Sequence, residues 1–65
     1  MHKVLANQYW KHYNGNEYEV LMLTNELSTN EQYPVTVVYK NIHTGSTWSK
    51  PLSDWHRSMT LTKPA

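Results

Sequence analysis

Cationic and aromatic side chains alternate in two stretches of the sequence, and together they could bind an anionic aromatic ligand. The first stretch covers residues 11–13 and the second covers residues 48–57. Aromatic rings stack on nucleobases for about 1–3 kcal/mol per base, while lysine and arginine attract phosphate. We therefore predict a ligand-binding site made of Lys11, His12, Tyr13, Trp48, Lys50, Trp55 and Arg57.

The residue types suggest a division of roles within this site. Stacking is assigned to Tyr13, Trp48 and Trp55, phosphate binding to Lys11, Lys50 and Arg57, and hydrogen-bond donation to His12. A structural explanation stays open beside the functional one, because Lys and Arg also pack on rings for stability alone. For Lys40 the structural explanation is favoured, since lysines on edge strands discourage aggregation between sheets.

The remaining chemistry of the sequence argues against an enzyme or a metal site. There is no cysteine, and the four histidines show no spacing typical of a zinc site. No serine lies in a Gly-x-Ser-x-Gly motif, and two glycines cannot build a phosphate loop. Ser53, Asp54 and His56 lie so close in sequence that they predict a local cap instead of a catalytic set. We expect a non-catalytic protein without metal or cofactor.

Size and charge narrow the possible partners. The 65 residues have room for one small domain, residues 1–65, whose thin core needs support from self-association because disulfides are excluded. A net charge of +1 leaves nucleic-acid binding possible but not favoured. No apolar run reaches the roughly 18 residues of a membrane span, and residues 1–6 lack the apolar stretch of a secretory signal. We expect a cytoplasmic protein without a membrane partner.

Alternating apolar and polar residues predict two hairpins. The first turns at Asn14-Gly15, which suits a two-residue turn, and the second turns around Gly45. In the second strand Tyr18, Val20 and Met22 are expected on one face, with Leu23 on the other. The four strands are expected at residues 9–13, 18–24, 35–40 and 47–50.

The C-terminal part is expected to be short and partly helical. Pro51 should end the fourth strand, and Ser53 should cap a helical turn that reaches Ser58. Residues 61–65 form either a last short strand or a frayed end. The fold class is therefore mainly β: a small, strongly bent antiparallel sheet or SH3-like barrel of four to five strands with a short C-terminal helical turn.

Four segments, in the same order, resemble domain-of-unknown-function family 1653. Residues 9–15 followed by 18–21 resemble its opening, residues 37–39 its central strand, and residues 48–52 its Trp-Val-Arg-Pro-Leu segment, with Trp55 where an aromatic follows. The resemblance covers about residues 9–59. It implies short bacterial and phage proteins with a compact β fold and no established activity.

The sequence departs from the family pattern at three places. Asn14 stands where lysine is common, Ser49-Lys50 replaces Val-Arg, and residues 26–29 replace a His-x-Glu-Thr stretch. A site that used this histidine would be altered here.

The size of the domain constrains any small-molecule site. Such pockets usually measure about 300–1,000 Å³, which so small a sheet cannot enclose. The ligand, a nucleotide or cyclic dinucleotide, is therefore expected between copies of a homodimer or larger homo-oligomer. By analogy with phage proteins, we predict an anti-defence sponge that sequesters a host immune signal in the host cytoplasm. The alternatives are a small-barrel interaction module for a protein or single-stranded nucleic acid, and an accessory domain without ligand.

Overall fold

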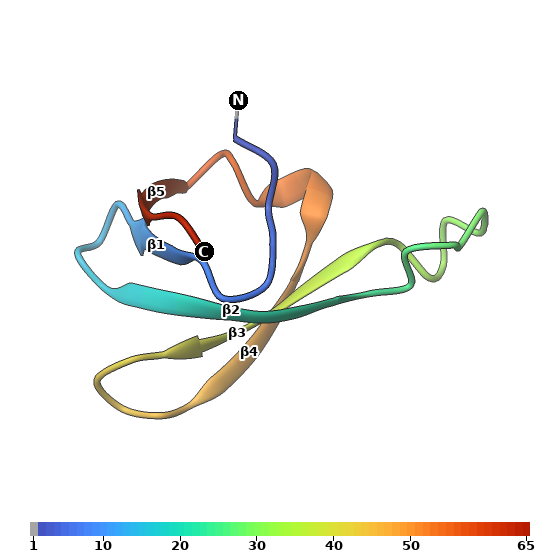
Figure 1. Ribbon diagram of the computed structural model, residues 1–65. Coiled ribbons are helices and arrows are strands. Elements are labelled where there is room, and N and C mark those ends of the chain that lie inside the picture. Colours follow the sequence, from blue (N-terminus) through green and yellow to red (C-terminus); the bar gives the residue numbers. More distant parts are fainter. Residues whose placement is uncertain (1) are drawn as a thin grey trace.

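The computed structural model describes residues 2–65, which form one antiparallel sheet (Figure 1). The elements are β1 (Tyr9–His12), β2 (Glu17–Thr24), β3 (Thr36–Asn41), β4 (Thr47–Pro51), the 3₁₀ helix η1 (Leu52–Asp54) and β5 (Met59–Lys63). The strand order across the sheet is β4-β3-β2-β1-β5. This architecture confirms the predicted mainly-β fold.

The sheet is strongly bent but does not close into a barrel. Strands β4 and β5 are its two edges, and no pairing joins them within residues 2–65. The N-terminal segment and η1 lie on the same side of the sheet, where the β1–β5 end curls over β2 (Figure 1). Of the two predicted forms, the chain therefore adopts the open, bent sheet and not the SH3-like barrel. No helix within the same residues is long and apolar enough to cross a membrane.

The first hairpin is confirmed, but its turn differs from the prediction. Strands β1 and β2 pair with Trp10 opposite Tyr18. A two-residue turn of the expected kind needs positive φ at both central residues. Gly15 has a φ of 96°, whereas Asn14 is not in the positive region. The His12 amide bonds to the Asn16 carbonyl at 2.8 Å, so the chain turns through three residues with glycine in the last position.

The second hairpin, between β3 and β4, is also confirmed. The amide of Gly45, which has a φ of 77°, donates to the Asn41 carbonyl at 2.8 Å. The buried Asn41 side chain accepts hydrogen bonds from the His43 and Thr44 amides at 2.8 and 3.1 Å. This side chain fixes the turn from inside, which is why a polar residue is buried at the end of β3.

A β-bulge in β2 corrects the predicted facing of its residues. Tyr18 and Val20 face the core as expected, but the pairing with β3 shifts between Val20 and Met22. At a bulge two residues oppose one, so the alternation of faces is inverted beyond it. Met22 is consequently 52% exposed, and Leu23 packs against the core.

The C-terminal segment also differs from the prediction. Helix η1 starts at Leu52, directly after Pro51, and no side chain caps it, so the predicted Ser53 cap is wrong. The Leu52 amide is held instead by the Val35 carbonyl at 2.8 Å, which places Ser53 inside the turn. Strand β5 begins at Met59, two residues before the expected start, because the buried Met59 side chain belongs to the core.

Amphipathic aromatic residues dominate the core. Their rings pack edge to face, with centroids 5.7 Å apart for Trp10 and Trp55, 4.9 Å for Trp55 and Tyr39, and 5.0 Å for Tyr39 and Tyr18. Such edge-to-face pairs add to the gain from burial. The remaining members of the core are Val4, Val20, Val37 and Met59.

Candidate functional site

Two adjoining hollows bring together five of the seven predicted ligand-binding residues. The larger, of about 480 Å³, lies over β1 and β5, and the smaller, of about 200 Å³, lies between the β1–β2 turn and the segment after η1. They share His12 and Tyr13. We call the two hollows together the basic surface. The predicted residues that line it are Lys11, His12, Tyr13, Lys50 and Arg57.

Two rings form the centre of the basic surface. The centroids of His12 and Tyr13 lie 4.2 Å apart, and Tyr13 is 83% exposed. The His12 Nδ1 accepts a hydrogen bond of 3.1 Å from the Asn14 amide. In a neutral imidazole this leaves Nε2 with the proton, because one ring nitrogen accepts and the other donates. The surface thus offers an exposed ring next to a hydrogen-bond donor.

Ser58 joins the parts of the basic surface. Its hydroxyl accepts a hydrogen bond of 3.0 Å from the Lys50 Nζ, and its carbonyl accepts one of 3.1 Å from the Tyr13 amide. Lys50 lies in β4 opposite the buried Val37, so it projects from the core-bearing face of the sheet. A single residue therefore holds the edge strand β4 and the β1–β2 turn around one hollow.

The charges of the basic surface are only partly neutralised. Arg57 forms an ion pair with Asp54, whose side chains are 79% and 47% exposed respectively. Ion pairs this exposed contribute only about 0–1 kcal/mol, so an anionic ligand can compete for the guanidinium. Lys11 is exposed on β1 opposite Glu17, and no salt bridge joins the two. Three cations and one carboxylate thus give this surface an excess of positive charge.

The two tryptophans of the predicted site have different positions. Trp55 is fully buried against Trp10 and Tyr39, so the prediction that it stacks on a ligand is wrong. Its indole Nε1 has no hydrogen-bond partner in the described chain. Trp48 is 55% exposed on β4, and its Nε1 donates to the Ser46 hydroxyl at 3.0 Å. It lines neither hollow, so its stacking role stays a prediction.

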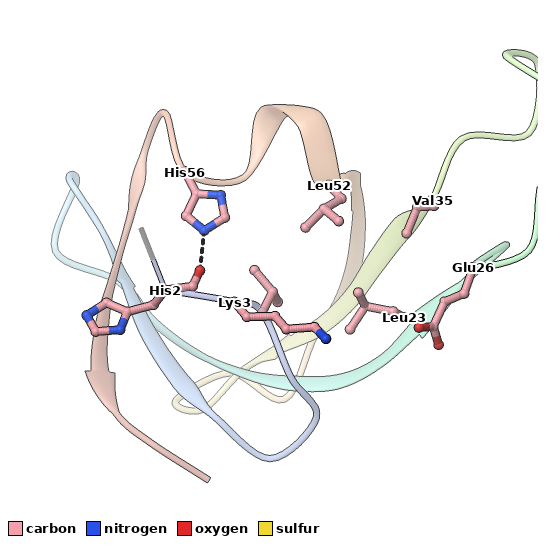
Figure 2. A pocket seen from close by; sticks show the side chains of 8 residues that line it. His2, Lys3, Leu23, Glu26, Val35, Leu52 and His56 are labelled. Atoms are coloured by element: carbon pink, nitrogen blue, oxygen red, sulfur yellow. Dashed lines mark hydrogen bonds between the residues drawn. The ribbon is translucent and has the colours of Figure 1, made fainter.

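A third, more apolar pocket was not predicted from the sequence. It measures about 390 Å³ and lies between the N-terminal segment, the β2–β3 hairpin and η1 (Figure 2). The His56 Nε2 donates to the His2 carbonyl at 2.6 Å beside it, as the dashed line in Figure 2 shows. Lining residues come from four separate parts of the sequence, and Leu23 faces inward only because of the bulge. Those residues are His2, Lys3, Val4, Leu23, Glu26, Val35, Leu52 and His56.

The titratable groups show one perturbed tyrosine and no metal centre. Burial, and to a lesser extent the neighbouring Tyr18, raises the pKa of Tyr39 above its ordinary value. Tyr39 belongs to the core and lines none of the hollows described above. Among residues 2–65, no three histidine, cysteine, aspartate or glutamate side chains gather closely enough to hold a metal ion.

These features define a small antiparallel β domain with a basic, ring-bearing surface at one end. The family described as "Protein of unknown function (DUF1653)" matches residues 8–63, and the chain belongs to that family. No curated protein and no solved structure matches it. Residues 2–7 lie outside the matched range, although the buried Val4 among them is part of the core.

Proposed function

We propose that this protein is a non-catalytic binding protein for a small anionic aromatic ligand, a nucleotide or cyclic dinucleotide. The observation that carries the proposal is the ring pair of His12 and Tyr13, which lines both hollows. Lys11 lines the larger hollow beside these rings, and Lys50 and Arg57 line the smaller one. An exposed ring beside cations suits a ligand that has both a base to stack and phosphates to neutralise.

The geometry supports a specific division of roles. The exposed Tyr13 ring takes the base, and the His12 Nε2–H donates a hydrogen bond to it. Lys50 and Arg57 approach the phosphates from the other side of the smaller hollow, and Arg57 exchanges Asp54 for a phosphate oxygen. Hydrogen bonds between charged partners are roughly twice as strong as those between neutral ones, so this exchange favours a phosphate.

A second copy of the chain completes the site in this proposal. The two hollows, of about 480 and 200 Å³, lie open at the surface, so a nucleotide bound there would stay partly exposed. A second basic surface facing the first would cover the ligand with a second set of rings and cations. Two-fold contacts are the commonest in homo-oligomers, and a cyclic dinucleotide would share that symmetry.

The proposed biological role is sequestration. A binding protein that holds a signalling nucleotide without converting it lowers the free concentration of the signal. In a phage-encoded member of this family, that activity would act as an anti-defence sponge in the host cytoplasm.

One observation favours a second candidate function, an interaction module for single-stranded nucleic acid or protein. The basic surface is open and continuous across two hollows, and the exposed Trp48 lies on β4, the edge strand that supplies Lys50. Single strands bind on open surfaces of this type, with bases stacked on successive rings. The affinity for a long oligonucleotide compared with a dinucleotide separates the two functions.

The test is a thermal-shift panel of mononucleotides, linear dinucleotides and cyclic dinucleotides, followed by calorimetric titration. Saturation at 100 times Kd should stabilise the protein by about 2.7 kcal/mol, and the recovered ligand should be chemically unchanged. Tyr13→Ala and Lys50→Ala should each weaken binding by about tenfold or more. Asp54→Asn should tighten it, because this change removes the competing carboxylate.

Lys40→Ala is the matched control for the lysine variants. Lys40 lies on the outer face of β3, where its Nζ is 3.9 Å from a Glu19 carboxylate oxygen, and it lines none of the three pockets. The Lys40→Ala variant should therefore bind the ligand with unchanged affinity. A panel that gives no shift, or equal losses for Lys40→Ala and Lys50→Ala, would contradict the proposed site. Tight binding of oligonucleotides alone would favour the interaction module.

A further inference from the structure

We infer that the apolar pocket and the adjacent β2–β3 loop form a self-complementary surface that pairs two copies of this chain. In this pairing Leu27 of each copy enters the apolar pocket of the other. The inference does not depend on the proposed ligand, because the pocket and the basic surface are separate. Leu52 and His56 line the pocket, whereas Asp54 and Arg57 of the same segment line the basic surface.

The pocket has an apolar interior with a charged margin. Val4, Leu23, Val35 and Leu52 supply its aliphatic side chains, and much more of its lining is apolar than in the other two hollows. The Lys3 side chain extends toward Leu23, and Glu26 lies beyond Leu23 (Figure 2). An aliphatic side chain therefore fits the interior better than a nucleotide does.

Leu27 is the side chain best placed to enter such a pocket. It is 97% exposed, more than any other large apolar residue of the described chain. Its loop projects well away from the sheet (Figure 1). Local hydrogen bonds hold the loop in shape: the Ser28 amide donates to the Asn25 carbonyl at 3.0 Å, and the Asn25 Nδ2 donates to the Pro34 carbonyl at 3.0 Å. A preorganised loop loses little conformational freedom on binding.

The order of residues along the loop explains why the occupant is a second copy. Glu26, which lines the pocket, directly precedes Leu27, so the projecting side chain and the pocket are neighbours on one surface. A two-fold axis pairs each such projection with the other copy's pocket, as an isologous interface requires. Entry of Leu27 also brings Glu26 beside the partner's Lys3, so opposite charges meet twice across the axis.

This pairing does not need the ligand and leaves the basic surface open. A dimer formed through Leu27 is therefore expected in the ligand-free protein. Assembly around a ligand would add a different contact. The dimer can be measured without ligand, and ligand binding can be measured whether or not the dimer forms. The failure of this inference is therefore distinguishable from the failure of the proposed function.

The test is sedimentation equilibrium of the ligand-free chain across micromolar to millimolar concentrations. We expect a monomer–dimer equilibrium, and Leu27→Ser should raise the dimer dissociation constant at least tenfold. Because Leu27 has almost no contact within its own chain, the variant should keep the circular dichroism and thermal unfolding of the native protein. Tyr33→Ser is the matched control. Tyr33 is 60% exposed on the same loop and lies outside the pocket lining, so its substitution should leave dimerisation unchanged.

A charge exchange makes the test specific to this arrangement. Lys3→Glu and Glu26→Lys should each weaken the dimer, since each change places like charges together at both ends of the interface. The double variant restores opposite charges and should recover most of the affinity. A chain that stays monomeric at millimolar concentration would overturn the inference. So would a dimer insensitive to Leu27→Ser, or a double variant as weak as the single ones.

Discussion

The side-chain Oε1 of Gln8 accepts a hydrogen bond of 3.0 Å from the indole Nε1 of Trp10, and both residues are buried. The same oxygen accepts a second hydrogen bond of 2.8 Å from the Leu5 amide, and the Gln8 Nε2 donates to the Lys3 carbonyl at 3.1 Å. One amide side chain therefore joins the core to the N-terminal segment.

Gln8→Leu should destabilise the domain by about 1–3 kcal/mol, because it leaves the buried Trp10 Nε1 and the backbone of the N-terminal segment without partners. Urea unfolding followed by tryptophan fluorescence measures the change. Gln32→Leu, in the exposed β2–β3 loop, is the control and should have a small effect. Equal effects of the two substitutions would mean that the Gln8 hydrogen bonds contribute nothing.

Trp55→Ala should cost about 3–5 kcal/mol, the range found for removal of a large buried aromatic side chain. This is comparable to the whole stability of a small domain, so Trp55→Phe provides a milder variant that should stay folded. Trp48→Ala, at a position that is 55% exposed, should change stability by no more than about 0.5 kcal/mol. Chemical denaturation measures the free energy of unfolding of all three variants. A larger loss for Trp48→Ala than for Trp55→Ala would contradict the assignment of Trp55 to the core.

Deletion of Leu21 should be tolerated better than deletion of Val38. Leu21 is the extra residue of the β2 bulge, and without it Val20, Met22 and Leu23 can keep their faces in a regular strand. Val38 lies in the regular strand β3, and its loss would turn Tyr39 or Val37 away from the core. Circular dichroism and amide dispersion in NMR spectra should show a folded chain for the first deletion only.

The free energy of unfolding should fall at alkaline pH because of Tyr39. Burial, with a smaller effect from Tyr18, raises the pKa of this residue in the folded state above the ordinary tyrosine value of about 10. The unfolded chain therefore releases the proton first, and stability that is fully present below pH 10 is lost as the pH rises through the folded-state pKa.

Tyr39→Phe should remove this contribution, so urea titrations should show a smaller loss of stability as the pH rises past the ordinary tyrosine pKa of about 10. Tyr33→Phe removes a tyrosine from the exposed loop and should keep the alkaline loss of the native chain. An unchanged pH profile for Tyr39→Phe would mean that another group causes the loss of stability at alkaline pH.

The hairpins could be predicted because their causes are local. Turn residues such as Asn14-Gly15 and Gly45, with alternating side chains on either side, specify where the chain reverses. The same local pattern placed Lys11, His12 and Tyr13 together at the first turn. Lys50 and Arg57 could be grouped with them only by residue type, and the sheet topology then brought them to the same hollow.

The features that escaped prediction depend on long-range packing. The bulge that turns Leu23 inward cannot be recognised from the alternation of residues in β2. The burial of Trp55 depends on its contacts with Trp10 and Tyr39, which are distant in sequence, whereas the sequence shows only an aromatic residue near a cation. The apolar pocket needs Val4 and Leu52 in one lining, although they lie 48 residues apart in the sequence.

Amide chemical-shift mapping tests most directly whether the basic surface binds an anionic aromatic ligand. The ¹⁵N-labelled chain is titrated with the cyclic dinucleotide or mononucleotide that gives the largest thermal shift, or with a cyclic dinucleotide if none does. We expect saturable shifts in residues 11–13, 50 and 57–60, and none in residues 25–35. Shifts confined to the apolar pocket, or no shifts at millimolar ligand, would contradict the account.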